Sequence, residues 1–261
     1  MSTDKPAGKK PARVAAKSAA KPAKAARPAP KGGAGGRPAV AKGAKSRHRS
    51  NRAWIDRHVN DPYVQAATRH GYRSRAAYKL AEIDEKDRLL RPGITVVDLG
   101  AAPGSWTQVV VERLRIGTGP ASGGRPPARV IALDILPMDP IPGVEIIQGD
   151  FRDEAVAARL AAALQGQPVD LVLSDMAPNL SGIGAADAAR SAHLWELALE
   201  FALAHCKPDG ALLIKVFQGS GYSQFVEQLK RRFVRVAVRK PPSSRQESAE
   251  TYLLAQGRKP E

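Results

Sequence analysis

Short runs of β-branched and aliphatic residues recur from residue 94 to the end of the chain, separated by longer stretches of helical periodicity. This alternation is typical of a parallel sheet covered by helices on both faces. The first five predicted strands are 94–98, 129–133, 144–147, 169–173 and 211–216. Two further runs, 233–238 and 251–255, flank a Pro-Pro-Ser-Ser loop, which predicts a terminal hairpin with one antiparallel strand.

The helix pattern is clearest over 187–205, where apolar residues recur at i, i+3, i+4 and i+7. A Lys-Pro-Asp-Gly stop follows it at 207–210. Upstream, Ser74 is expected to cap a helix that places Lys79 just inside the domain. Residues 117–128 contain too much Gly and Pro for either regular structure, so they predict a long surface loop.

Composition changes sharply near residue 50. The first 50 residues hold 14 Lys and Arg against one acid, Asp4, and so carry most of the net charge of +16. This segment has too few large apolar residues to offset chain entropy by burial. We expect a disordered basic tail over 1–50 and one folded domain, which would carry any catalytic site, over 51–261. The tail either solubilises the chain or attracts nucleic acid phosphates.

The chain has few of the residues that build disulfides or zinc sites. Cys206 is its only cysteine, which excludes an internal disulfide, and we expect it to pack as a small hydrophobe. The five histidines lack zinc-like spacing, so no structural metal is expected. The Arg- and Ala-rich start loosely resembles an organelle transit peptide, but no apolar run suits a secretory signal or membrane helix, and we expect a cytoplasmic protein.

A turn rich in small residues follows the strand predicted at 94–98. In this turn, Asp98 precedes Gly100 and Gly104, a pattern that lets backbone pass close to a ligand at a strand's carboxyl end. A dinucleotide-binding turn would read G-x-G-x-x-G instead. The carboxylate of Asp98 would repel a diphosphate and favour a ligand with a cationic or polar amino-acid end. A tight turn without any ligand would use the glycines in the same way.

Three more acids come at the ends of predicted strands, namely Asp134, Asp150 and Asp175. Asp134 follows the second strand, where an acid in dinucleotide folds accepts both ribose hydroxyls. Each acid alone could equally cap a helix. Because the carboxyl ends of parallel strands share one edge of the sheet, four such acids indicate a ligand site there.

Several motifs indicate a particular protein family and not only a nucleotide-binding site. They are residues 98–104, Leu-Pro-Met-Asp-Pro-Ile at 136–141, Gln-Gly-Asp-Phe-Arg-Asp at 148–153, Ser-Asp-Met-Ala-Pro-Asn at 174–179, Lys-Val-Phe-Gln-Gly at 215–219 and Arg-Lys-Pro at 239–241. From about Trp54 to Pro260 the chain resembles the FtsJ/RlmE family of bacterial ribosomal RNA large-subunit 2′-O-methyltransferases. The resemblance implies an α/β, Rossmann-like class I methyltransferase fold, with a seven-stranded, mostly parallel sheet, one antiparallel strand and helices on both faces.

The resemblance also implies a reaction. The family transfers a methyl group from S-adenosylmethionine to the ribose 2′-hydroxyl of a uridine in the aminoacyl-tRNA-binding loop of 23S ribosomal RNA. The large subunit in late assembly is the implied substrate, with no membrane and a monomeric enzyme. By motif, the family's catalytic tetrad falls on Lys79, Asp175, Lys215 and Glu250. Its cofactor-binding residues fall on Gly104, Trp106, Asp134, Asp150 and Asp175, and the turn argument adds Asp98.

Each member of the tetrad can be given a role. A ribose hydroxyl is a poor nucleophile until its proton is engaged, whereas a sulfonium methyl is already activated. Lys215 is the candidate base, because burial and a neighbouring Lys79 would both lower its pKa. Asp175 and Glu250 oppose that shift, so we assign them to orienting the lysines. An isolated strand-end lysine more commonly extends to solvent, but the surrounding motif favours the catalytic role.

The sequence departs from the family pattern at three places. Ser105 stands where many relatives have a second glycine, Ala77 stands where an aromatic residue is common, and the loop at 117–128 is longer than usual. None of these departures removes a predicted reacting group. Trp106 could stack on a base or on adenine, although an aromatic residue after a loop is as often simple packing.

Contacts with RNA are harder to assign. Two basic groups flank the predicted tetrad in the sequence, Arg69, Arg73 and Arg75 before it and Arg231, Arg232, Arg235, Arg239 and Lys240 near the last hairpin. They could bind phosphates, but solvated helix faces give a similar pattern.

Two other functions remain open. A nicotinamide-dependent oxidoreductase would share the sheet and the acid after the second strand. The absence of a G-x-G-x-x-G turn argues against this function. A non-enzymatic nucleic acid binder would explain the basic tail but leaves the predicted tetrad unused.

Overall fold

The computed structural model describes residues 59–117, 127–179 and 181–260. The predicted tail at 1–50 and most of the predicted loop at 117–128 lie outside these residues. Within the described ranges, no helix is both long and apolar enough to span a bilayer.

Seven strands form one sheet in the order β3-β2-β1-β4-β5-β7-β6. In chain order they are β1 Thr95–Leu99, β2 Arg129–Asp134, β3 Val144–Gln148, β4 Val169–Ser174, β5 Cys206–Phe217, β6 Phe233–Arg239 and β7 Glu250–Arg258. Strands β1 to β5 run parallel, and β7 lies antiparallel between β5 and β6. The predicted sheet and its antiparallel strand are confirmed.

One strand begins earlier than predicted. We expected it to start at residue 211, after a Lys-Pro-Asp-Gly stop, but β5 reaches back to Cys206. The reason is that Cys206 pairs with Val169 on β4, while the register shifts between Val169 and Leu171. The segment at 207–210 is therefore an irregular part of the strand.

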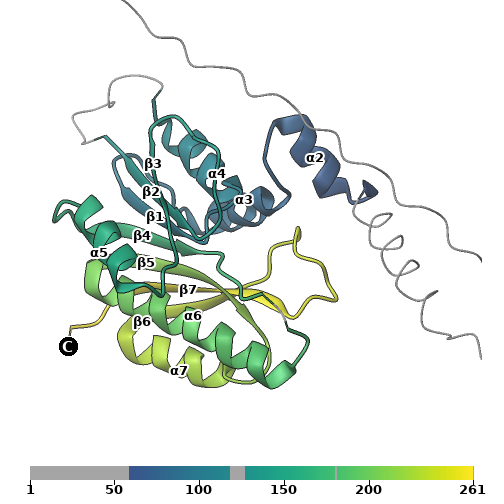
Figure 1. Cartoon of the computed structure of the whole chain (residues 1–261), viewed down its shortest axis with the longest axis vertical. Helices are drawn as coiled ribbons and strands as arrows, with labels where there is room; N and C mark the ends of the chain where they lie inside the picture. The colour runs from purple at the N-terminus through teal and green to yellow at the C-terminus, as the bar shows by residue number, and fades with distance from the viewer. Residues whose placement is uncertain (1–58, 118–126, 180, 261) are drawn as a thin grey trace, which may run out of the picture. The chain divides into compact units, whose positions relative to one another are not determined.

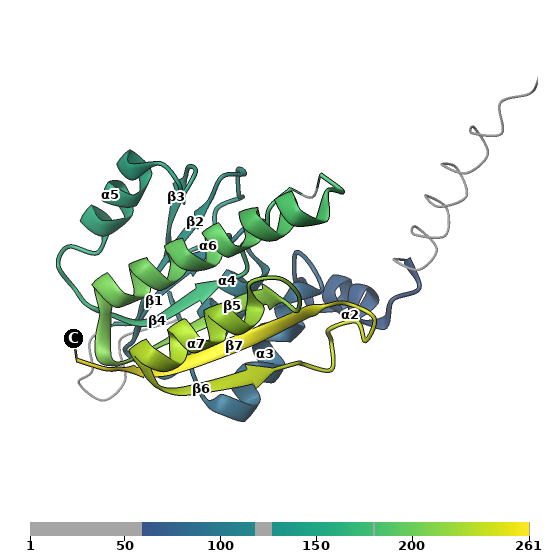
Figure 2. The same ribbon diagram turned by 90° about the horizontal axis from the view of Figure 1, so that it is seen from below.

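The helices of the described ranges are α2 Pro62–His70, α3 Ala76–Asp87, α4 Ser105–Leu114, α5 Glu154–Ala163, α6 Gly184–His205 and α7 Tyr222–Arg232. Helices α3 and α4 cover one face, and α5, α6 and α7 cover the other (Figures 1 and 2). Helix α2 packs beside α3, with the rings of Tyr63 and Tyr78 5.4 Å apart. The residue at the N-cap of α3 is Arg75, although the hydroxyl of the predicted cap, Ser74, does accept a hydrogen bond from the Ala76 N–H at 3.2 Å.

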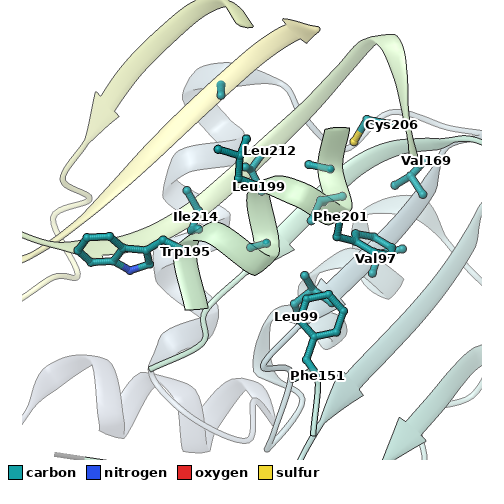
Figure 3. Packing of buried hydrophobic residues seen from close by; sticks show 14 of the residues in the cluster. Val97, Leu99, Phe151, Val169, Trp195, Leu199, Phe201, Cys206, Leu212 and Ile214 are labelled. Carbon is teal, nitrogen blue, oxygen red and sulfur yellow. The ribbon is translucent and has the colours of Figure 1, made fainter. Parts of the chain in front are cut away.

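Strand residues alternate between two buried clusters because successive side chains point to opposite faces. On β1, Val97 and Leu99 join the cluster under α5, α6 and α7, whereas Val96 joins the cluster under α3 and α4. Figure 3 shows the first of these clusters, in which Cys206 is buried. Burial raises the pKa of the Cys206 thiol to about 12, which suits a packing residue and not a nucleophile.

Candidate active site

A cavity of about 520 Å³ opens at the carboxyl ends of β1, β2, β3 and β4. Its lining comes from the segments that follow those strands and from the first turns of α6. Three of the four predicted acids line it, namely Asp134, Asp150 and Asp175, and so does Lys215 from β5. None of the four acids is the N-cap of a described helix, so the capping alternative does not hold.

Glycine is required at both ends of the turn after β1. Gly100 has a φ of 75°, and a Cβ there would lie 2.8 Å from the backbone nitrogen of Met176, which follows β4. Gly104 has a φ of 107°, and a Cβ there would lie 2.6 Å from Nη1 of Arg73. Gly100 lets β1 and β4 end close together beside the cavity, where it is part of the wall, and Gly104 lets the side chain of Arg73 reach the turn.

Asp134 and Asp150 are both held in place by hydrogen bonds. The carboxylate of Asp134 accepts backbone hydrogen bonds from Ala102 and Leu136 at 2.9 and 2.8 Å. Asp150 is bound by the guanidinium of Arg152, which also lines the cavity. This hydrogen bonding lowers the pKa of Asp150, so the carboxylate stays ionised.

Asp98 is completely buried and does not line the cavity. Its Oδ2 accepts a hydrogen bond from the Thr107 hydroxyl at 2.7 Å, while Oδ1 is a buried oxygen without a hydrogen-bond partner in the described part of the chain. Burial raises the pKa of Asp98 to about 7, and the charges of Asp175 and Asp134 add to that rise while Thr107 opposes it. A donor such as a ligand's ammonium group could satisfy this unpartnered oxygen.

The other predicted cofactor residues lie behind the cavity wall. Trp106 is buried under α3, where its indole N–H donates to the Ala76 carbonyl at 2.9 Å. Gly104 begins α4 and contributes no surface to the cavity. Ser105 turns its hydroxyl toward Ser74, at 2.7 Å, so this departure from the family pattern also points away from the cavity.

The register of the last strand brings distant residues to one face of the sheet. Lys215 on β5 lies directly opposite Tyr252 on β7, so both side chains point the same way. Glu250 is two residues from Tyr252 and shares that face. This is the face covered by α3, which carries Lys79.

The four residues of the predicted tetrad meet as two ion pairs. Nζ of Lys215 lies 3.1 Å from Oδ1 of Asp175, and Nζ of Lys79 lies 2.7 Å from Oε1 of Glu250. Lys215 is only 8% exposed, although it sits at the end of a strand. The lysine therefore does not extend to solvent, and a buried charge of this kind needs its partner.

Tyr252 connects the two ion pairs, and the sequence reasoning did not identify it. Its hydroxyl lies 3.2 Å from Oε1 of Glu250 and 3.4 Å from Oδ1 of Asp175. Its ring packs against Trp106, with centroids 5.6 Å apart, and Nζ of Lys79 lies 5.9 Å from the ring centroid. The alternation of side chains along a strand could have identified it, because a residue two positions after Glu250 must share its face.

The electrostatics of this cluster keep each group in a defined form. Burial and then the charges of Asp175 and Glu250 raise the pKa of Tyr252 well above 10, so its hydroxyl remains a donor. Burial alone would raise the pKa of Glu250, but the ammonium of Lys79, followed by Lys215 and the Ser244 hydroxyl, lowers it on balance. The cluster therefore presents an ionised Glu250 and a protonated Tyr252 beside the two lysines.

Several of the basic residues proposed for RNA are engaged within the protein. The guanidinium of Arg73 donates to the carbonyls of Pro103, Asp139 and Pro140. Arg239 forms a bidentate pair with Asp87, at 2.6 Å for both bonds. These side chains organise the loops around the site, so a phosphate would have to compete with the bonds they already make.

No group of three or more His, Cys, Asp or Glu side chains in the described ranges is arranged to hold a metal ion. The cavity is joined, through Asp175 and Lys215, to the cluster of lysines and acids. Such a cluster can accept a proton from a hydroxyl group placed at the cavity's end.

Comparison with known proteins agrees with this geometry. The family model described as FtsJ-like methyltransferase matches residues 72–258. The protein named ribosomal RNA large subunit methyltransferase E from Bordetella parapertussis is 59% identical over 210 residues, 80% of this chain and 98% of the relative. Its namesake from Cupriavidus pinatubonensis is 57% identical over 220 residues, 82% of this chain and 96% of the relative.

A solved structure shares the fold as well. A crystal structure described as a ribosomal RNA methyltransferase from Plasmodium falciparum superposes with a TM-score of 0.61 and 32% identity, covering 72% of this chain and 98% of that one. The seven-stranded sheet with its antiparallel β7 is the Rossmann-like class I methyltransferase fold predicted from the sequence. The chain belongs to the FtsJ-like methyltransferase family and is an enzyme that uses S-adenosylmethionine as its methyl donor.

Proposed function

We propose that this enzyme methylates the ribose 2′-hydroxyl of a uridine in the aminoacyl-tRNA-binding loop of 23S ribosomal RNA. The observation that carries the proposal is the ion pair of the buried Lys215 with Asp175, which lies at the boundary between the cavity and the cluster of Lys79, Glu250 and Tyr252. The names of the relatives from Bordetella and Cupriavidus support ribosomal RNA of the large subunit as the substrate. Such a substrate favours the cytoplasm as the site of action.

The cavity fits S-adenosylmethionine. Asp134 would bind the ribose of the cofactor and Asp150 its adenine side, since both acids line the wall. The unpartnered oxygen of Asp98 suits the amino-acid end, with Gly104 and Trp106 supporting the loop and Asp175 at the inner end. When bound, the cofactor supplies a methyl group already activated by a positive sulfur.

The remaining work is done by the protein's own residues. Lys215, as the neutral amine, accepts the proton of the ribose hydroxyl and becomes the ammonium, because it is the lysine that lines the cavity. Oδ1 of Asp175 lies 3.1 Å from Nζ of Lys215 and so orients the side chain. Lys79 and Glu250 form the far side of the cluster and place the acceptor ribose, while Tyr252 keeps the two pairs in register.

Mapping 2′-O-methyl groups tests the proposed substrate directly. Ribosomes from a strain lacking this protein should lack one 2′-O-methyluridine in the aminoacyl-tRNA-binding loop, detected by mass spectrometry of nuclease fragments. The purified enzyme should restore it on isolated large subunits with S-adenosylmethionine. An unchanged 23S map, with a methyl group missing from transfer RNA or messenger RNA instead, would contradict the assignment.

The same assay separates the proposed substrate form from its alternatives. Because a whole subunit is the proposed substrate, free 23S RNA should be methylated more slowly than large subunits. Equal rates on the two substrates would show that the assembled particle is not required.

A further inference from the structure

The connection between β6 and β7 is fastened to the helix that carries Lys79. Glu82 lies one turn after Lys79 on α3, so both side chains project from neighbouring positions of one helix face. One carboxylate oxygen of Glu82 accepts hydrogen bonds from the backbone N–H and the hydroxyl of Ser243, at 2.9 and 2.7 Å. Ser243 lies in that connection and is completely buried.

A second contact fixes the other side of the same residue. The guanidinium of Arg75 donates to the Ser243 carbonyl and pairs with Asp61. Arg245 also reaches Asp61, at 3.5 Å. The N–H, hydroxyl and carbonyl of Ser243 are therefore all bound by residues at the start of the domain.

The next residue carries this anchoring to the tetrad. The hydroxyl of Ser244, which is also buried, donates to Oε1 of Glu250 at 3.1 Å. Lys79 lies 2.7 Å from the same oxygen. Helix α3 thus holds Glu250 twice, directly through Lys79 and indirectly through Glu82, Ser243 and Ser244.

We propose that Glu82 and Ser244 are positioning residues for methyl transfer, which fix the Lys79–Glu250 pair by docking the β6–β7 connection on α3. Neither residue lines the cavity, so neither is expected to touch the cofactor. The backbone of Glu250 is held at the start of β7 by its pairing with Phe217, so the docking acts on the carboxylate. Without it the carboxylate would lose the Ser244 hydroxyl, and a displacement by even an ångström would disturb the Lys79–Glu250 pair. This inference rests on the proposed function only for its activity measurements.

The kinetic test compares two glutamates on the same helix. Glu82→Ala and Ser244→Ala should each lower kcat by about tenfold or more while leaving the affinity for S-adenosylhomocysteine unchanged. Glu85→Ala is the matched control, because the Glu85 side chain is 67% exposed and pairs with the surface residue Arg113 at 3.4 Å. The conservative variants Glu82→Gln and Ser244→Thr keep an acceptor and a hydroxyl, and should recover most of the rate.

A double-mutant cycle shows whether Glu82 works through Glu250. In a Glu250→Ala background the removal of Glu82 should cause little further loss, because the group it positions is already absent. Losses that multiply in the double variant would overturn the proposal, since Glu82 would then act independently of the pair. A fall in affinity for S-adenosylhomocysteine as large as the fall in kcat would also overturn it, by indicating general damage to the fold.

Proteolysis tests the docking without any RNA. Trypsin should cleave after Arg245 faster in Glu82→Ala than in the wild type or in Glu85→Ala, because local opening exposes the connection. If the wild-type enzyme methylates no RNA, the proposed substrate fails while this measurement still reports on the docking. Equal cleavage rates in the Glu82→Ala and Glu85→Ala proteins would refute the docking itself.

Discussion

The cavity proposed for the cofactor and the cluster of Lys79, Glu250 and Tyr252, here called the acceptor cluster, are adjacent. They are assembled from very different parts of the chain. Most of the cavity wall consists of segments that follow their own strands, and Asp134 and Asp150 each accept a backbone hydrogen bond from the residue two positions on, Leu136 and Arg152. The longer-range bond from Ala102 to Asp134 joins two such neighbouring turns. The acceptor cluster instead joins Lys79 to Glu250, which are 171 residues apart. Local turns therefore define the cofactor half, whereas the pairing of β7 with β5 defines the catalytic half.

This difference separates binding from turnover. A change in the cavity wall should alter cofactor affinity, whereas a change in the cluster should alter the rate at saturating cofactor. Lys215 and Asp175 are the residues that belong to both halves.

The largest expected effect comes from removing the proposed base. Lys215→Ala should slow single-turnover methyl transfer to large subunits by about a thousandfold, while titration calorimetry shows near-normal binding of S-adenosylhomocysteine. Lys215→Arg should be nearly as slow, because an arginine keeps the positive charge but cannot accept the proton. A rapid Lys215→Arg enzyme would mean that charge alone is needed at this position.

Asp98 predicts a strong dependence of stability on pH. Its pKa is raised from 3.8 to about 7 in the folded protein, so the folded state retains a proton that the unfolded state has lost between those values. The stabilisation is full below about pH 4 and is lost as pH rises to 7, by at most about 4 kcal/mol. Urea unfolding from pH 4 to 8 should show this fall in wild type but not in Asp98→Asn.

Cofactor binding sharpens that test, because an ammonium group beside Asp98 would favour its ionised form. Saturating S-adenosylhomocysteine should then reduce the pH dependence in the wild type. Parallel pH curves for the wild type and Asp98→Asn, with or without ligand, would show that this carboxyl does not titrate in that range.

A change in the cavity wall should give the opposite signature to Lys215. Asp134→Asn is expected to weaken S-adenosylhomocysteine binding by about tenfold to a hundredfold, because a charged acceptor is lost, while kcat at saturating cofactor is largely kept. Asp139→Asn is the matched control, since it removes the same charge from an exposed position on the same loop. If kcat falls and affinity does not, the division into two halves is wrong.

The smallest expected effect concerns the bridge between the ion pairs. Tyr252→Phe removes a hydroxyl whose two contacts are long, at 3.2 and 3.4 Å, and keeps the ring against Trp106. We expect kcat to fall by about threefold to tenfold, with cofactor affinity and thermal stability unchanged. A loss as large as that of Lys215→Ala would instead make the tyrosine an essential part of proton transfer.

The sequence predicted the sheet well, because strands buried on both faces read as continuous apolar runs with acids at their ends. Asp134, Asp150 and Asp175 were correctly placed at one cavity by this reasoning. Motif resemblance predicted a tetrad of Lys79, Asp175, Lys215 and Glu250, and in the structure these residues lie together as two ion pairs, while their joint role in catalysis stays a prediction.

Other features depend on packing between distant elements, which periodicity does not reveal. The guanidinium of Arg73 donates to three carbonyls and lies next to where a Cβ of Gly104 would be. Predicting this from the sequence would require knowing that the segments at 103–104 and 138–141 meet. The burial of Trp106 and the bridging hydroxyl of Tyr252 likewise follow from α3 lying over β7. Basic composition alone therefore suggested phosphate contacts where the fold uses the same groups internally.

The late position of β7 in the chain has a consequence for synthesis. Every residue that lines the cavity is at position 215 or earlier, whereas Glu250 and Tyr252 belong to the last strand to be made. During translation the cofactor half can form before the catalytic half, since chains fold as they emerge. A nascent chain halted before residue 250 has all the cavity-lining residues but lacks Glu250 and Tyr252, so under the proposed mechanism we expect only a chain extended through β7 to modify RNA.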